Sequence, residues 1–180
     1  KNQENQLLKI FYPKLYVPAI TEIKPGLLLD LGLKGVIFDL DNTIIRRDSD
    51  SALPEVTELI LELRGEGLRM GIVSNNSRRR VGAIAAEMEM PFVHRAVKPF
   101  PGPFKRALEL MGTSPQETAL VGDQIFTDIF GGNLAGLYTI LVVPMEGKEF
   151  WGTRLISSHL EKLVLARIKK DPGVLHGKWD

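Results

Sequence analysis

Two aspartates one residue apart, Asp39 and Asp41, follow the apolar run "GVIF". Carboxylates can attack as nucleophiles, move protons and bind divalent cations, so this pair is where we first look for chemistry. A single Asp after a strand is more often a turn former or a helix N-cap. The pair alone therefore leaves both interpretations open.

Three later apolar runs are also followed by polar side chains. These are Ser74, Asn75, Asn76, Lys98, Asp123 and Asp128. Each has an ordinary explanation when taken alone: a turn with an N-cap, a solvated loop lysine, or an acid favoured by the dipole of a helix N-terminus. Acids, a hydroxyl and an ammonium at the ends of four successive runs nevertheless have chemistries that fit one reaction.

The elements that must position these groups alternate between short apolar runs and helical patterns. The sequence predicts strands at 35–40, 68–76, 91–96, 118–123 and 138–144, and helices at 54–67, 77–88, 103–112 and 126–136. This alternation indicates an α/β domain with a mostly parallel five-stranded sheet and helices on both faces. Because ligands bind at the carboxyl ends of such strands, the polar groups are expected to share one crevice.

Composition narrows the possible classes of protein. The chain has 180 residues, 44% of them hydrophobic and 25% charged, with a net charge of +1. This suits one domain, for which we predict an N-terminal arm (1–30), a catalytic core (31–145) and a C-terminal amphipathic helix with a tail (146–180). The absence of cysteine excludes a disulfide scaffold, thiolate catalysis and a cysteine-built zinc site. The balanced charge predicts no nucleic-acid partner.

The segments "DLDNT", "SNN", "KP" and "GDQIFTD", in this order and spacing, resemble the four motifs of the haloacid-dehalogenase-like (HAD) phosphohydrolases over roughly residues 35–143. More narrowly, "FDLDNT", "IVSNN", "RAVKP", "YPKLYVPAI" and "FWGTR" resemble the YqeG-like HAD phosphatases, which are similar to the HAD-type phosphatidylglycerophosphate phosphatases of mitochondria and plastids. The resemblance implies a HAD-like Rossmannoid three-layer sandwich.

The same resemblance implies roles for individual residues. Asp39 would be the nucleophile that forms an aspartyl-phosphate, and Asp41 would protonate the leaving group and then deprotonate the attacking water. Lys98 would place a positive charge beside the nucleophile. Ser74 and Asn75, together with Lys98, would hold the substrate phosphate.

The carboxylates also imply a metal cofactor. Three acids and a phosphate with about two negative charges cannot share a site unaided, and Mg²⁺ suits an all-oxygen set of ligands. The expected direct ligands are Asp39, Asp123 and the main-chain carbonyl of Asp41, with Asp128 binding directly or through water.

The spacing of the motifs leaves no room for a cap domain. Only 32 residues separate Asp41 from Ser74 and 23 separate Ser74 from Lys98, and a helix and a strand fill each gap. By analogy with the family, an open site admits large substrates such as lipid head groups, nucleic-acid ends or proteins.

Three functions are therefore considered. The first is Mg²⁺-dependent hydrolysis of phosphatidylglycerophosphate at a membrane surface, and the second is hydrolysis of a soluble nucleotide or sugar phosphate. The third is a non-enzymatic receiver-like or scaffold domain. It is disfavoured because the D-x-D pair ends the first strand of the predicted core and no motif residue is missing.

Residues 151–170 predict a basic amphipathic helix. Such a helix can lie on an anionic membrane, or it can pack on the core of its own protein or on a partner subunit, and packing is favoured. The expected location is the cytoplasm or the inner face of a membrane, and no apolar run reaches the ~20 residues needed to span a bilayer. "RRR" (78–80) is expected to form an exposed first helical turn, and the oligomeric state is left open.

Overall fold

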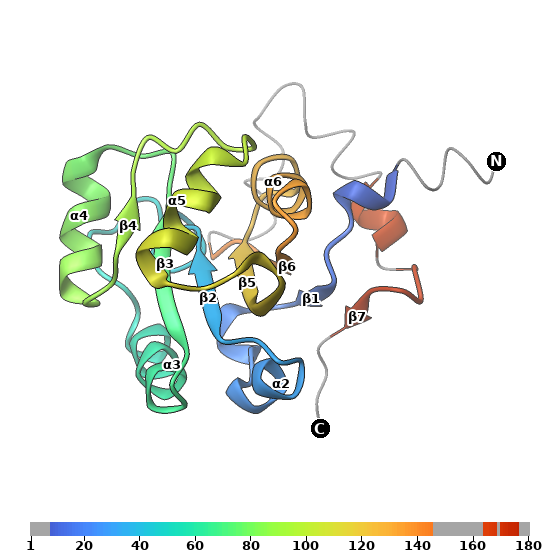
Figure 1. Cartoon of the computed structure of the whole chain (residues 1–180), viewed down its shortest axis with the longest axis horizontal. Helices are drawn as coiled ribbons and strands as arrows, with labels where there is room; N and C mark the ends of the chain where they lie inside the picture. Colours follow the sequence, from blue (N-terminus) through green and yellow to red (C-terminus); the bar gives the residue numbers. More distant parts are fainter. Residues whose placement is uncertain (1–7, 146–163, 169, 177–180) are drawn as a thin grey trace.

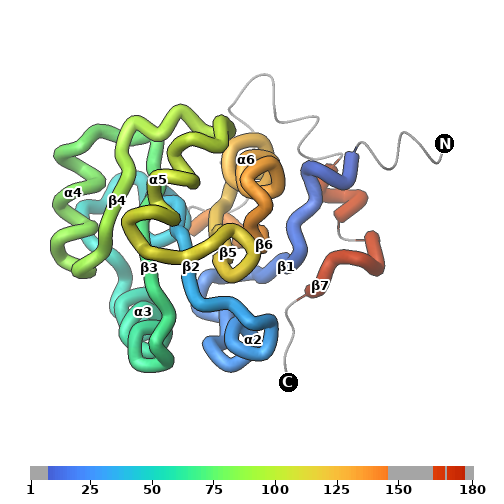
Figure 2. Tube along the Cα trace, in the orientation of Figure 1, coloured from blue at the N-terminus to red at the C-terminus, as the bar shows by residue number. Residues whose placement is uncertain are grey.

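A computed structural model describes residues 8–145, 164–168 and 170–176, and in it the chain forms one parallel β-sheet flanked by helices (Figures 1 and 2). The strands are β1 Leu15–Val17, β2 Gly35–Phe38, β3 Arg69–Val73, β4 Phe92–Val93, β5 Thr118–Gly122, β6 Tyr138–Val142 and β7 Leu175–His176. The helices are α2 Pro25–Asp30, α3 Pro54–Gly65, α4 Arg78–Glu87, α5 Gly102–Met111 and α6 Phe130–Leu134. Shorter elements are 3₁₀ turns at Lys9–Phe11, Ile20–Glu22 and Pro115–Glu117 and a π-helical turn at Ile125–Ile129.

Helices cover both faces of the sheet. Successive side chains of a strand point to opposite faces, so β2 gives Val36 and Phe38 to one apolar layer and Ile37 to the other. Buried residues of α2, α3 and α4 pack in the first layer, and buried residues of α5 pack in the second. The three-layer sandwich predicted from the sequence is confirmed.

Local sequence signals set the ends of several helices. Pro54 occupies the first turn of α3, where its missing N–H costs nothing. The hydroxyl of Ser77 accepts the backbone N–H of Arg80 and caps α4. Gly112 ends α5 in the left-handed conformation at φ 64°, which glycine adopts without steric cost. These signals set where α3 and α4 begin and where α5 ends, and therefore where the connecting loops meet the helices.

The order of the strands places a crevice beside β2. The strands pair in the order β4-β3-β2-β5-β6-β1-β7, and all pairs are parallel. From β2 the chain moves outward through β3 and β4, and it then returns to the other side of β2 as β5. The order therefore reverses between β2 and β5, and the loops at their carboxyl ends diverge there to leave room for a ligand.

No cap domain covers this crevice within residues 8–145. A loop (39–53) and α3 connect β2 to β3, and α4 alone connects β3 to β4. The predicted absence of an inserted cap is confirmed for this part of the chain.

Among the described residues the sheet has seven strands, so the predicted number of five was wrong. The two extra strands are β1 and β7, which have three and two residues and lie outside the alternating strands and helices of the predicted core. In the predicted N-terminal arm, β1 pairs with β6 and its Leu15 and Val17 are fully buried. In the predicted tail, β7 pairs with β1.

Most of the predicted amphipathic helix lies outside the described residues. Residues 164–168 are helical, and Val164 and Ile168 are buried against Ile125, Ile129 and Leu141. For this one turn the structure favours packing on the core. Among the described residues, no helix combines the length and the apolar character needed to cross a membrane.

Candidate active site

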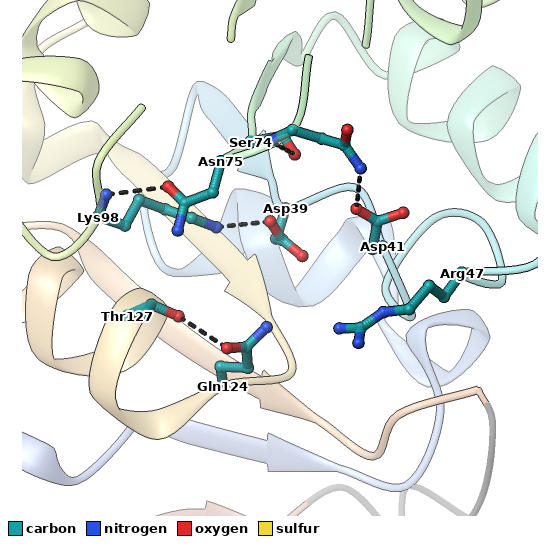
Figure 3. A pocket seen from close by; sticks show the side chains of 9 residues that line it. Asp39, Asp41, Arg47, Ser74, Asn75, Lys98, Gln124 and Thr127 are labelled. Atoms are coloured by element: carbon teal, nitrogen blue, oxygen red, sulfur yellow. Dashed lines mark hydrogen bonds and ion pairs between the residues drawn. The ribbon is translucent and has the colours of Figure 1, made fainter. Parts of the chain in front are cut away.

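The crevice at the carboxyl ends of β2, β3, β4 and β5 is a pocket of about 410 Å³. Figure 3 shows its lining side chains, which come from four loops that are far apart in the sequence. The lining residues are Asp39, Asp41, Arg47, Ser74, Asn75, Asn76, Lys98, Gln124 and Thr127. The structure thus brings five of the seven predicted site residues to one pocket, and the other two, Asp123 and Asp128, have carboxylates close to that of Asp39.

Three aspartates form an acid cluster, by which we mean Asp39, Asp123 and Asp128. One carboxylate oxygen from each lies within 4.8 Å of the others, and all three residues are buried. Asp39 continues from β2, where its N–H donates to the carbonyl of Val121 at 2.9 Å. Asp123 directly follows β5, and Asp128 lies in the π-helical turn. The predicted convergence of these acids is present in the structure.

Gly122, the last residue of β5, makes the cluster possible. A Cβ atom at this position would lie 2.5 Å from the Cβ of Asp128, closer than non-bonded carbons can approach. Asp128 is held in turn by the backbone N–H of Gln124, which donates to its Oδ2 at 3.1 Å. A glycine at the end of this strand therefore lets the π-helical turn fold back over the sheet.

Lys98 bridges two members of the acid cluster. Its Nζ lies 2.5 Å from Oδ1 of Asp39 and 2.5 Å from Oδ1 of Asp128, and only 2% of its side chain is exposed. Its backbone N–H donates to Oδ1 of Asn75 at 3.0 Å.

The residue before Lys98, Val97, has a φ of 49°, a conformation in which a β-branched residue is strained. Such strain is typical of functional loops that the surrounding structure holds in place.

Burial and like charges shift the protonation of these groups. Burial raises the pKa of Asp39 to about 7; Lys98 opposes this shift and Asp128 adds to it. Burial likewise raises the pKa of Asp123 well above its usual range, with further contributions from Asp39 and Asp128. Burial alone would lower the pKa of Lys98, but the adjacent Asp128 and Asp39 carboxylates outweigh it and raise that pKa. One ammonium therefore does not balance three carboxylates.

The acid cluster fits a divalent cation with oxygen ligands. Oδ1 of Asp123 is buried and has no hydrogen-bond partner among the described residues. An orphaned carboxylate oxygen next to two other carboxylates is costly without a compensating charge. Magnesium prefers such hard oxygen ligands.

Asp41 lies on the other side of the pocket and is held from α4 and the β3–α4 loop. Its Oδ2 accepts from Nδ2 of Asn76 at 3.0 Å, and its Oδ1 accepts from Nε and Nη2 of Arg80 at 3.1 and 3.0 Å. Arg80 is only 20% exposed in its side chain, so its predicted exposure with Arg78 and Arg79 was wrong. Arg80 is partly buried because its guanidinium binds Asp41 and the backbone carbonyl of Arg47 in the neighbouring loop.

The residues predicted to hold phosphate lie at the end of β3. Ser74 is buried, and its Oγ accepts the backbone N–H of Asn76 at 3.2 Å. Asn75 lines the pocket while its Oδ1 binds the backbone of Lys98. Both residues line the pocket on the side of β3, near Asp39 (Figure 3).

Three pocket residues were not singled out from the sequence. Gln124 and Thr127 belong to the "GDQIFTD" segment, and their position between two predicted ligands was the available signal. Arg47 comes from the loop after β2, where no spacing or motif distinguishes it from Arg46.

Comparisons with known proteins agree with this geometry. Residues 45–136 match the family model of the haloacid dehalogenase-like hydrolases. The probable phosphatase YqeG of Bacillus subtilis (strain 168) is 36% identical over 174 residues, which cover 97% of this chain and 99% of that protein. The chloroplastic/mitochondrial phosphatidylglycerophosphate phosphatase 1 of Arabidopsis thaliana is 28% identical over 167 residues, which cover 88% of this chain and 47% of that protein.

A solved structure shows the same fold. The HAD-superfamily hydrolase from Ehrlichia chaffeensis superposes with a TM-score of 0.51 at 17% identity, covering 77% of this chain and 98% of that one. The family match and the near-complete alignment with the probable phosphatase YqeG lead to one assignment. The chain belongs to the haloacid dehalogenase-like hydrolases, and it is a phosphatase.

Proposed function

We propose that this phosphatase is a Mg²⁺-dependent phosphomonoesterase that works through an aspartyl-phosphate on Asp39, with phosphatidylglycerophosphate as its substrate. The observation that carries the mechanism is the acid cluster with Lys98 at its centre, open to a pocket that Ser74 and Asn75 also line. This arrangement combines a carboxylate nucleophile, positive charge beside it and donors for phosphate oxygens.

In the first step a carboxylate oxygen of Asp39 attacks the phosphorus of the monoester. The bond between phosphorus and the leaving oxygen breaks with its electron pair, and Asp41 donates a proton to that oxygen. The products are an alcohol and an aspartyl-phosphate. Lys98 and the donors around Ser74 offset the negative charge on the transferring group.

In the second step a water molecule attacks the phosphorus of the aspartyl-phosphate. Asp41, now a carboxylate, takes a proton from this water, and the bond from phosphorus to Asp39 breaks. Inorganic phosphate leaves, and both aspartates return to their starting states. The same residue therefore acts first as the acid and then as the base.

Mg²⁺ would be held by Asp39, Asp123, Asp128 and the main-chain carbonyl of Asp41. When bound, it would neutralise part of the charge on the phosphate and favour the ionised form of the nucleophile. The raised pKa values of Asp39 and Asp123 and the orphaned oxygen of Asp123 support this cofactor.

Two observations support a lipid substrate. The plant relative named for phosphatidylglycerophosphate aligns with 88% of this chain, and no cap covers the pocket within residues 8–145. An uncapped pocket can reach a head group that remains attached to a membrane. The basic helix predicted at 151–170 would assist there, and vesicle sedimentation of the full chain tests that part.

A soluble phosphomonoester is the second candidate. Other relatives are named for soluble substrates, among them a glyceraldehyde 3-phosphate phosphatase of Pyrococcus furiosus at 28% identity over 49% of this chain.

A substrate panel distinguishes the two. It compares phosphatidylglycerophosphate in mixed micelles with nucleotides, sugar phosphates and glyceraldehyde 3-phosphate, all with Mg²⁺. We expect the highest kcat/KM for the lipid, and a wide margin in favour of a soluble monoester would contradict the lipid proposal.

A further inference from the structure

Arg47 is a second cation in the catalytic pocket that the proposed chemistry does not use. It is half-buried and lines the pocket together with Asp41 and Gln124. Figure 3 shows its side chain on the Asp41 side, extending into the pocket between Asp41 and Gln124, whereas Lys98 approaches Asp39 from the opposite side. The two cations therefore address different parts of a bound substrate.

The loop that carries Arg47 is held by specific hydrogen bonds. Oδ1 of Asn42 accepts the backbone N–H of Arg47 at 3.3 Å. Nη2 of Arg80 donates to the carbonyl of Arg47 at 2.8 Å and to that of Ser49 at 3.0 Å, and Nη1 of Arg80 pairs with Asp50 at 3.0 Å. A loop whose backbone is held at several points loses little backbone freedom when one of its side chains binds a ligand.

The position of Asp41 tells which part of the substrate Arg47 faces. If Asp41 protonates the leaving oxygen, as in the proposed function on which this inference rests, the leaving alcohol lies on the Asp41 side of the pocket. Arg47 lies on that same side, so it meets groups attached to the leaving alcohol rather than the transferred phosphate. A guanidinium binds phosphate oxygens through two parallel N–H donors.

We propose that Arg47 determines specificity by binding a second anionic group, a phosphate or phosphodiester, on the leaving alcohol. Phosphatidylglycerophosphate has such a group, because its phosphodiester is joined through glycerol to the terminal phosphomonoester. A soluble molecule with two phosphate groups presents the same chemistry. The preferred substrate class is therefore a phosphomonoester with a second phosphate nearby.

A pair of soluble substrates isolates this contact from any effect of the lipid chains. Glycerophosphoglycerol phosphate carries the monoester and the diester without acyl chains, and glycerol 3-phosphate carries only the monoester. We expect wild-type protein to favour the first substrate. In Arg47→Gln the ratio of the two kcat/KM values should fall about tenfold or more, mainly through KM, because a charge-assisted contact is lost.

Arg46→Gln is the matched control. Its side chain is exposed, pairs with Asp48 at 3.3 Å and is not among the residues that line the pocket. It should leave the substrate ratio as in wild type. Thermal unfolding of both variants checks that each remains folded. Arg47→Lys should recover part of the ratio, because lysine restores the positive charge but not the two parallel N–H donors of the guanidinium.

Three outcomes would overturn the proposal: an unchanged ratio in Arg47→Gln, equal losses on both substrates, or a wild-type preference for glycerol 3-phosphate. Equal losses would mean that Arg47 acts on the transferred phosphate. Phosphate release from a simple aryl phosphate measures the mechanism separately. If micellar phosphatidylglycerophosphate is not hydrolysed while the soluble two-phosphate substrate shows the expected ratio, the lipid proposal fails and the role of Arg47 stands.

Discussion

The two sides of the pocket are built in different ways. On the side of Lys98 the acid cluster is buried. The side chains of the ion pair between Lys98 and Asp39 are 2% and 6% exposed. On the side of Asp41 the corresponding pair with Arg80 has side chains that are 16% and 20% exposed. The first side places unbalanced charge away from water, and the second is a hydrogen-bonded loop at the surface.

This difference suggests a division of labour. Electrostatic interactions are stronger in a buried environment, so the Lys98 side suits the bonds that form and break at phosphorus. The Asp41 side is more exposed and suits proton transfer and contact with the rest of the substrate. Variants on the two sides should therefore differ in the size and the kind of their effects.

The largest effect is expected at the nucleophile. Asp39→Asn keeps the shape of the side chain but removes the attacking carboxylate, so kcat should fall by about 10⁴-fold or more. Phosphate release from an aryl phosphate measures this change. Asp48→Asn alters an exposed acid and should retain activity, and equal activity of wild type and Asp39→Asn would disprove the mechanism.

The next largest effect is expected at the buried cation. Lys98→Met should lower kcat by about 100-fold or more, because the charge beside the transferring phosphate is lost. It should also lower the free energy of unfolding by about 3–5 kcal/mol without metal, since two buried carboxylates lose their partner. Chemical denaturation measures the second effect. Lys105→Met, on the exposed face of α5, is the control, and a stability equal to that of wild type would contradict the account.

A smaller effect is expected on the Asp41 side. Arg80→Gln removes the charged donors to Asp41 and should lower kcat about tenfold on a substrate with a single phosphate. Stability should change by only about 1 kcal/mol, because the pair is partly solvated. Arg79→Gln, an exposed neighbour on α4, is the control. Arg80→Lys should rescue part of kcat, and a loss in Arg80→Gln as large as in Lys98→Met would end the contrast between the two sides.

The pH dependence of stability tests the buried side of the pocket, where Asp39 lies beside Lys98. Without metal the folded protein holds the proton of Asp39 up to its pKa of about 7, whereas the unfolded chain releases it near the ordinary value of 3.8. This residue therefore stabilises the fold below about pH 4, and the contribution is lost as the pH rises to about 7. Mg²⁺ requires ionised ligands, so it should raise Tm more at pH 8 than at pH 6.

Thermal unfolding with and without Mg²⁺ at the two pH values tests this expectation. Asp123→Asn should weaken the response to Mg²⁺, whereas Asp48→Asn should keep it. A rise in Tm that is the same at both pH values would show that Asp39 does not titrate in this range.

The sequence predicted the central sheet and much of the pocket, and the reasons lie in particular residues. The runs that became β2, β3, β5 and β6 are long and apolar, and Asp39 and Asp123 follow two of them directly. Because neighbouring strands are parallel, their carboxyl ends lie at the same edge of the sheet. The strands β1 and β7 were missed because they lie outside the alternating strands and helices of the predicted core, and their pairing depends on segments distant in the chain.

Arg47 and Arg80 show a second limit. Arg80 lies in a run of three arginines that was predicted to be exposed, and no motif distinguishes Arg47 from Arg46. Only the folded chain brings Arg80 to Asp41 and Arg47 into the pocket. Their roles depend on side-chain contacts 33 to 39 residues apart in the chain. Composition and spacing alone do not encode such contacts.

The most direct test of the central claim is to trap the phosphorylated protein. Asp41→Asn should slow hydrolysis of the intermediate more than its formation when the substrate has a good leaving group, because attack of water needs the base. Acid quenching during turnover of an aryl phosphate, followed by peptide mass spectrometry, should find one added phosphoryl group on Asp39. An unmodified Asp39 in an actively turning-over sample, or a phosphoryl group on another residue, would contradict the account.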